Sequence, residues 1–208
     1  MNIPKLITET AILAPPFLLA LTMHELAHGY VADRLGDPTA RAAGRLTMNP
    51  LKHLDPLGVL FFVIMKIGWA KPVPVNPSYF RRPEFGMMLV ALAGPAANLV
   101  LAVVSVVAVK VVVAVPLLPG MILHPLVKML AASVWINIML TVFNLLPIPP
   151  LDGSRVLKGL LPKGLAAAYG SLERFGFLIL LAFFYTGLLN RILNPILSFA
   201  QGLLLGRN

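Results

Sequence analysis

Three long apolar stretches constrain the fold of this chain more than any other feature. They run over residues 11–32, 87–109 and 129–151. A helix rises 1.5 Å per residue, so about 22 residues cross the roughly 30 Å hydrocarbon core of a bilayer. Two shorter apolar stretches, 175–189 and 192–206, are marginal for a span. The sequence therefore predicts an all-α polytopic membrane protein with about four to five transmembrane helices.

The composition agrees with a membrane protein and excludes several other classes. Of the 208 residues, 58% are hydrophobic and 12% are charged, whereas a soluble domain has about 25% charged residues. The same balance excludes a disordered chain. The absence of cysteine excludes disulfides, thiol nucleophiles and cysteine-bound metal. The net charge of +9 then points to cytoplasmic loops rather than to nucleic acid.

The distribution of lysine and arginine predicts the topology. Twelve of the 17 basic residues lie in three segments, 34–52, 66–82 and 155–174, and the connection over 116–125 contains none. If the spans alternate, all three segments lie on one side of the membrane. The positive-inside rule places that side in the cytoplasm and the N-terminus outside. We expect the first stretch to be a retained span, because no small-residue cleavage site precedes His24.

The segment 44–83 does not fit a regular transmembrane helix. Five prolines interrupt it before Pro83, and its apolar run 58–65 is too short to cross a bilayer. Residues 71–77 alternate like an edge strand interrupted by proline. We expect a membrane-dipping loop with a short β element on the cytoplasmic side, in a setting where protein or water surrounds its backbone.

The pattern His24-Glu25-Leu26-Ala27-His28 lies inside the first apolar stretch. Residues four apart lie on one face of a helix, so both imidazoles can bind a single Zn²⁺. Glu25 lies beside them, in position to accept a proton from the attacking water. Ionisable side chains at this depth are costly without a partner, and a metal ion is such a partner. We therefore predict a metal site with Glu25 as the general base.

Two histidines leave a catalytic zinc one protein ligand short. Asp152 follows the third stretch in Leu146-Pro-Ile-Pro-Pro-Leu-Asp152-Gly153, where prolines break the helix and can turn the carboxylate back into the bundle. The same residues also fit a surface turn, and local sequence does not decide between the two. Asp33 and His53 are the next candidates. The others are expected to be solvated or on the opposite side of the membrane: Asp37, Asp55, Glu84 and His124.

These motifs together resemble the site-2 protease family of intramembrane zinc metalloproteases, in its compact prokaryotic branch without a PDZ domain. The resemblance rests on the histidine motif, on Ala93-Gly-Pro-Ala-Ala-Asn98 and on the segment Asn144 to Gly153, and it covers residues 11–155. It implies that Asp152 is the third zinc ligand and that Asn144 helps to position the substrate.

Small and polar residues line one face of each of the two later spans. On the third span they recur at helical spacing, as Ser133, Asn137, Thr141 and Asn144. On the second span the corresponding residues are Ala91, Gly94, Asn98, Ala102 and Ser105. Small residues let helices approach closely, and buried amides then bridge them. We expect most of these residues to hold the helices together, with Asn144 as the exception.

The function predicted from the sequence is hydrolysis of peptide bonds in or near transmembrane segments, with one Zn²⁺ per chain. The partners expected are a membrane-protein substrate and the lipid bilayer, without nucleic acid, in a multi-pass protein of the cell membrane. We expect one membrane-embedded domain over 1–208, with a catalytic core over about 11–155 and C-terminal helices over about 164–206. A zinc or proton-coupled transporter is the main alternative, and a catalytically silent scaffold is a third.

Overall fold

A computed structural model describes residues 3–65, 68–114 and 118–205, and within these ranges the regular structure is helical. The long elements are α1 (Ile3–Arg34), α4 (Pro83–Ala114), α5 (Gly120–Asn144) and α9 (Leu188–Leu205). The short α-helices are α2 (Thr39–Ala42), α3 (Pro56–Met65), α6 (Asp152–Leu160), α7 (Lys163–Gly170) and α8 (Gly176–Tyr185). Three 3₁₀ turns complete the described part: η1 (Pro50–Lys52), η2 (Pro77–Tyr79) and η3 (Ser171–Phe175).

Four candidate membrane spans occur in the described part, which confirms a polytopic α-helical membrane protein. They are α1, α4, α5 and the stretch Lys163–Tyr185, which joins α7, η3 and α8. The third span differs in position from the sequence prediction, since α5 begins at Gly120 and ends at Asn144 rather than covering 129–151. The reason is the proline-rich segment after Asn144, because proline lacks the amide hydrogen that a helix needs.

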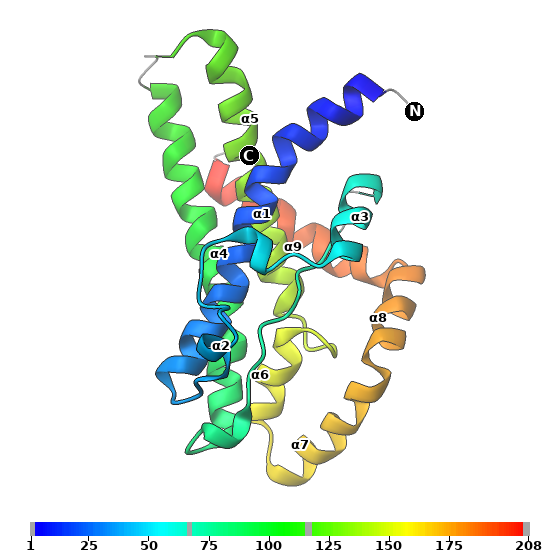
Figure 1. Cartoon of the computed structure of the whole chain (residues 1–208). Helices are drawn as coiled ribbons and strands as arrows, with labels where there is room; N and C mark the ends of the chain where they lie inside the picture. Colours follow the sequence, from blue (N-terminus) through cyan, green and yellow to red (C-terminus); the bar gives the residue numbers. More distant parts are fainter. Residues whose placement is uncertain (1–2, 66–67, 115–117, 206–208) are drawn as a thin grey trace.

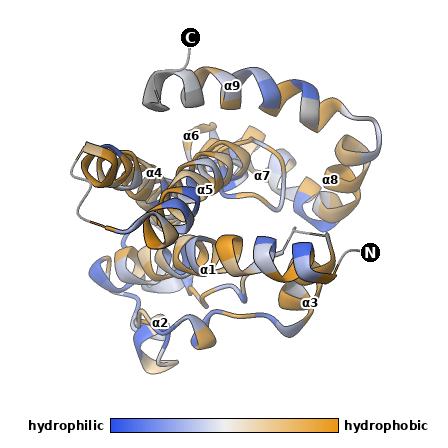
Figure 2. Cartoon of the chain, turned by 90° about the horizontal axis from the view of Figure 1, so that it is seen from above, coloured by the Kyte–Doolittle hydropathy of each residue, from blue (hydrophilic) through white to orange (hydrophobic). Residues whose placement is uncertain are grey.

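The bundle is layered around α4 and α5. Seen from above in Figure 2, these two helices lie between α1 on one side and α9 on the other, and α1 and α9 both contact α5. A buried apolar cluster joins Val106 of α4, Ile138 of α5 and Leu193 of α9. Leu146, Ile148 and Leu151, which follow α5, are buried in the same cluster. The connection between α5 and α6 is therefore part of the core rather than a surface loop.

The small and polar faces of α4 and α5 meet, as the sequence predicts. The Asn98 amide nitrogen donates a hydrogen bond to Asn137 Oδ1 at 2.8 Å, and the Ser105 and Ser133 hydroxyls are hydrogen-bonded at 2.8 Å. Thr141 Oγ1 donates to the Pro95 carbonyl at 3.2 Å. These bonds satisfy polar groups between two apolar helices, where an unsatisfied group is costly.

The segment between α1 and α4 rises along the bundle and returns, as Figure 1 shows. At its far point α3 packs beside the middle of α1, where the Phe17 and Phe62 rings stack at 4.1 Å. This arrangement fits the predicted membrane-dipping loop. The expected β element is reduced, within the described residues, to one isolated antiparallel bridge between Leu54 and Ala70. Residues 71–76 have no regular secondary structure and run along the bundle as an open segment (Figure 1), because Pro72 and Pro74 lack donors for a ladder.

Asp37 fastens the returning part of this segment to the end of α1. The sequence predicts a solvated carboxylate at this position, but the side chain is fully buried. It accepts hydrogen bonds from the Thr39 hydroxyl and amide and, at 2.7 Å, from the Asn76 amide. Burial raises the pKa of Asp37, but these hydrogen bonds outweigh it and hold that pKa below its usual value. The expectation was wrong because nearby basic residues do not reveal backbone donors 39 residues away.

Arg45 provides a second attachment for the returning segment. Its guanidinium donates to the Lys71 carbonyl at 2.6 Å and to the Pro72 carbonyl at 3.2 Å. These contacts and those of Asp37 hold residues 71–76 at both ends. The backbone between them is therefore held in place beside α1.

Candidate active site

Three ligand-capable atoms from α1 and α6 converge inside the helix bundle. His24 Nε2 and His28 Nε2 lie 3.0 Å apart, and Asp152 Oδ2 lies 3.2 Å from the first and 3.3 Å from the second. All three residues are at most 9% exposed. They form the one group of three or more potential metal-binding side chains found in the described part of the chain.

The spacing and chemistry of this group fit zinc. Bonds of about 2.0–2.2 Å from a tetrahedral zinc place neighbouring donor atoms roughly 3.3 Å apart, close to the distances observed here. Asp152 Oδ2 is buried, and no hydrogen-bond donor reaches it among the described residues. A buried carboxylate oxygen without a donor is costly unless a cation faces it. Two histidines and one carboxylate also leave a fourth position free, as in catalytic zinc sites.

The outer nitrogen of each imidazole is bound in a way that directs Nε2 toward the site. His28 Nδ1 lies 2.7 Å from the Val90 carbonyl, which can only accept, so Nδ1 carries the proton. His24 Nδ1 lies 2.6 Å from Asn98 Oδ1. A hydrogen bond at one ring nitrogen fixes the tautomer and leaves the lone pair of the other for a metal. The Nε2 lone pairs of both imidazoles are therefore available to a metal ion.

The orientation of the Asn98 amide follows from its neighbours. Its nitrogen donates to the Ala20 carbonyl at 3.2 Å and to Asn137 Oδ1 at 2.8 Å, so its oxygen must face His24. The Asn137 amide is itself fixed, because its nitrogen donates to the Ser133 carbonyl at 2.8 Å. From the sequence, Asn98 is predicted to pack helices together. Its hydrogen bond to His24 could have been anticipated from one feature of the sequence: Asn98 lies on the same face of α4 as Gly94.

Gly94 leaves room for the imidazoles on the face of α4. A Cβ at this position would lie 2.4 Å from His28 Nε2 and 2.6 Å from His24 Cε1. These separations are far shorter than any van der Waals contact, so a larger residue would displace the rings. The close approach of α4 to α1 at the site thus depends on a residue without a side chain.

The turn before α6 brings Asp152 to the site. Asp152 is the first residue of α6, and a Cβ at Gly153 would lie 2.2 Å from the Leu145 carbonyl oxygen. The start of α6 can therefore pack against the end of α5 only because residue 153 is glycine. The Tyr169 hydroxyl donates to the Pro147 carbonyl at 2.9 Å and supports the turn from outside. Of the two sequence interpretations, the geometry agrees with a carboxylate directed into the bundle.

Glu25 is half-buried beside the histidines and faces the open segment. Its Oε2 accepts a hydrogen bond from the Val73 amide at 2.9 Å. A Cβ at Gly29, one turn further along α1, would lie 3.1 Å from Val73 Cγ1, so segment and helix are in close contact there. The carboxylate is thus held near the histidines by a backbone donor.

The remaining candidates lie elsewhere or are engaged in other bonds. Asn144 is half-buried at the end of α5, and its amide nitrogen donates to the Leu140 carbonyl at 3.0 Å.

The alternative metal ligands are engaged in other contacts. Asp33 forms an ion pair with Arg41. His53 Nε2 is hydrogen-bonded to the Thr47 carbonyl at 2.9 Å. Asp55 accepts from the first amides of α3. The structure therefore gathers His24, His28 and Asp152 but not the other candidate ligands.

The chain is similar in sequence to a known peptidase family and to two bacterial proteins. A family model described as peptidase family M50 matches residues 120–184. The chain is 42% identical to "Putative zinc metalloprotease YwhC" of Bacillus subtilis over 192 residues. This aligned region covers 87% of this chain and 83% of the relative. The chain is 32% identical to "Putative zinc metalloprotease Rip2" of Mycolicibacterium smegmatis over 187 residues. This aligned region covers 84% of this chain and 67% of the relative. No solved structure matches the chain significantly.

Proposed function

Because the chain belongs to peptidase family M50 and is a membrane-embedded zinc metalloprotease, we propose that it cleaves membrane proteins within or next to their transmembrane segments. The observation that carries this proposal is the convergence of three donor atoms at 3.0–3.3 Å between helices long enough to span a bilayer. A catalytic group among such helices acts on peptide bonds that lie in or near the membrane. The proposed zinc ligands are His24, His28 and Asp152.

Each residue of the site has a role in the proposed hydrolysis. Zinc, when bound, polarises a peptide carbonyl and makes water acidic enough to act as a nucleophile near neutral pH. Glu25 takes the proton from the attacking water and then delivers it to the leaving amine. Asn98 and the Val90 carbonyl hold the two imidazoles in the ligand tautomer. The Val73 amide orients Glu25, and the helices around the site limit access of bulk water.

The open segment 71–76 is the proposed docking edge for the substrate. A peptide bond in a helix is hydrogen-bonded and shielded, so the substrate must unwind locally before attack. An unwound strand gains main-chain hydrogen bonds when it adds to an exposed edge. Val73 already contacts Glu25 through its amide, so a strand laid along this segment would pass the general base. Asn144, at the end of α5, is proposed to position the substrate from the other side.

The proposed topology places the active site toward the cytoplasm and the N-terminus outside. The basic segments near α2, α6 and α7 lie at one end of the bundle in Figure 1, which supports this orientation. The catalytic core is proposed to span about 11–155, with the helices over about 164–206 completing one domain. A transporter predicts ligands spread along a path, whereas the described residues contain one compact cluster.

The test combines metal analysis with cleavage of a single-span substrate in vesicles. The wild-type protein should carry about one zinc per chain and cleave the substrate within or next to its span. Glu25→Gln should keep the metal and lose activity by about 10²–10⁴-fold, the contribution of general acid–base catalysis. His24→Ala should lose both metal and activity. A wild-type protein that binds zinc but moves it across the vesicle membrane without cleaving any substrate would exclude the protease proposal.

A further inference from the structure

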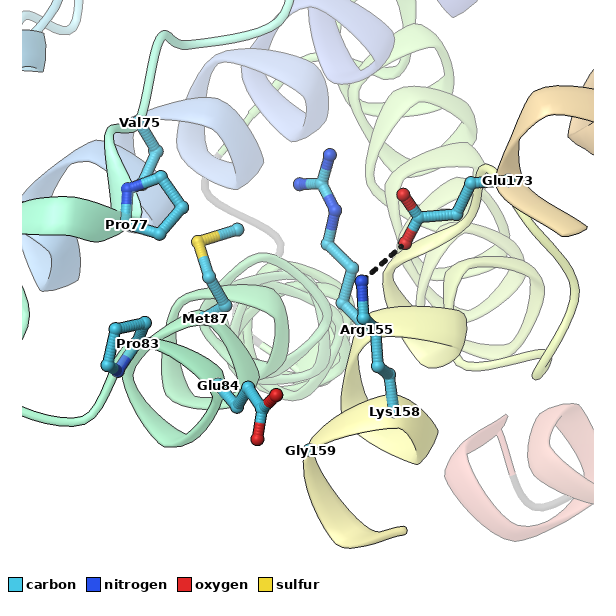
Figure 3. Close-up of a pocket in the computed structure, with 9 residues that line it drawn as sticks. All are labelled: Val75, Pro77, Pro83, Glu84, Met87, Arg155, Lys158, Gly159 and Glu173. Carbon is cyan, nitrogen blue, oxygen red and sulfur yellow. Dashed lines mark hydrogen bonds and ion pairs between the residues drawn. The ribbon is translucent and has the colours of Figure 1, made fainter. Parts of the chain in front are cut away.

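A cavity of about 350 Å³ lies between the segment before α4, the start of α4 and α6. Val75 and Pro77 line one side of it, Met87 of α4 lies between, and Arg155 and Lys158 of α6 line the other side (Figure 3). The cavity is distinct from the histidine–aspartate group. It is large enough for one amino-acid side chain and several waters.

Two basic and two acidic side chains line this cavity, and among the described residues Lys158 and Glu173 are paired, whereas Glu84 and the exposed Arg155 have no ion pair. The Lys158 ammonium lies 3.4 Å from Glu173 Oε1, so its charge is already matched. Glu84 belongs to the first turn of α4, and Figure 3 shows the Arg155 side chain directed away from it. Among the described residues, no hydrogen bond or ion pair holds the Arg155 guanidinium. A guanidinium presents several donors in a planar fork that fits a carboxylate.

Two connections tie this cavity to the active site. Arg155 follows Asp152 by three residues on α6, so the two side chains lie on one helix face, a single turn apart. Val75 follows Val73, whose amide holds Glu25, in the open segment. An extended chain advances about 3.3 Å per residue, so a strand along this edge reaches the cavity about two to four residues from the bond beside Glu25.

We propose that this cavity is a substrate subsite in which Arg155 binds an acidic side chain, an aspartate or glutamate, about two to four residues from the scissile bond. The inference rests on the proposed proteolysis and adds a preference for one chemical class of substrate. Val75, Pro77 and Met87 contact the aliphatic part of that side chain, and the guanidinium binds its carboxylate. The Lys158–Glu173 pair closes the side of the cavity near η3.

The test measures cleavage of a substrate series by the full-length protein in vesicles. Glutamate, glutamine or lysine is placed in turn at each of about five positions on either side of the scissile bond. The wild-type protein should prefer glutamate over lysine by about tenfold in kcat/KM at one or two neighbouring positions, the size of one charge-assisted hydrogen bond. Arg155→Glu should reverse that preference at the same positions. Lys163→Glu, with the same charge change on the exposed start of α7, should leave it unchanged.

The outcomes separate this inference from the proposed function. Cleavage of all substrates at equal rates, or a preference that survives in Arg155→Glu, overturns the subsite and leaves the protease assignment intact. If Arg155→Glu does not fold, Arg155→Gln should abolish the preference without reversing it, and a retained preference again overturns the subsite. If zinc-loaded wild-type protein cleaves no substrate above the level of Glu25→Gln, the proposed function fails and the subsite fails with it.

Discussion

Asp152 Oδ2 lies 3.2 Å from His24 Nε2, although the two residues lie on different helices at distant points of the chain. The contact joins the first span to the turn that follows α5. Because Asp152 Oδ2 has no donor in the described part of the structure, the pair is arranged for a cation between its members. The predictions below test this arrangement and the elements that maintain it.

Asp152→Asn should weaken zinc binding and abolish cleavage. The amide keeps the size of the side chain but removes the negative charge that faces the two imidazoles, and zinc prefers a carboxylate oxygen. Asp152→Glu should retain part of the activity. Zinc content of the purified protein and the cleavage rate are the measurements.

The matched control for this change is Glu9→Gln, because Glu9 is exposed and pairs with Lys5 on the surface of α1. It should keep both metal and activity. Stoichiometric zinc and normal cleavage in Asp152→Asn would move the third ligand elsewhere, with Asp33 or His53 as the next residues to test.

Gly94→Ala should displace the imidazoles and reduce zinc content without unfolding the protein. The added methyl carbon would lie 2.4 Å from His28 Nε2, and a packed interior cannot absorb that overlap without moving the ring. Gly164→Ala is the control, since no atom of the described residues lies within 4 Å of its Cβ position. Both variants are compared by metal analysis and thermal unfolding. Full zinc occupancy in Gly94→Ala would show that α4 is not in close contact with the site.

Asn98→Ala should change zinc affinity, whereas Asn144→Ala should change substrate binding. Loss of Asn98 frees the His24 ring to change tautomer or rotate, which should weaken zinc binding by about 10–100-fold. Asn144→Ala should keep the metal and raise KM, if Asn144 positions the substrate. Competition with a zinc chelator and steady-state kinetics measure the two effects. Equal metal affinity of wild type and Asn98→Ala would reduce Asn98 to a packing residue.

Asp37→Asn should destabilise the protein by about 1–3 kcal/mol, the cost of breaking buried hydrogen bonds to a charged group. Since the pKa of Asp37 is lowered in the folded state, its stabilisation is present above the unfolded value of about 3.9 and is lost as the pH falls further. The wild-type Tm should therefore drop more than that of Asp37→Asn between pH 6 and the acid range. The fluorescence of the two tryptophans reports unfolding. Parallel acid dependence in the two proteins would contradict the role of Asp37.

The topology can be tested by cysteine labelling, because the chain has no native cysteine. Ala42→Cys and Gly164→Cys should react with a membrane-impermeant reagent only from the cytoplasmic side. Met121→Cys, at the start of α5, should react only from outside, and Met121 is 87% exposed. Labelling of the first two positions from opposite sides would contradict the bundle, in which both lie at the same end.

The amino-acid sequence by itself determines the membrane-spanning helices and the local part of the site. Apolar runs of span length and the four-residue spacing of His24 and His28 depend on helical periodicity, which acts over neighbouring residues. The break after Asn144 likewise follows from prolines in the segment itself.

Only the tertiary structure decides which distant groups meet. It brings Asp152 to the histidines, directs the Asn98 oxygen toward His24, and makes Gly94 the point where α4 approaches the two rings. It also buries Asp37, which local charges suggested would be solvated. These relationships depend on how helices pack and on which backbone groups lie opposite each side chain, and such contacts leave no periodic signal in one sequence.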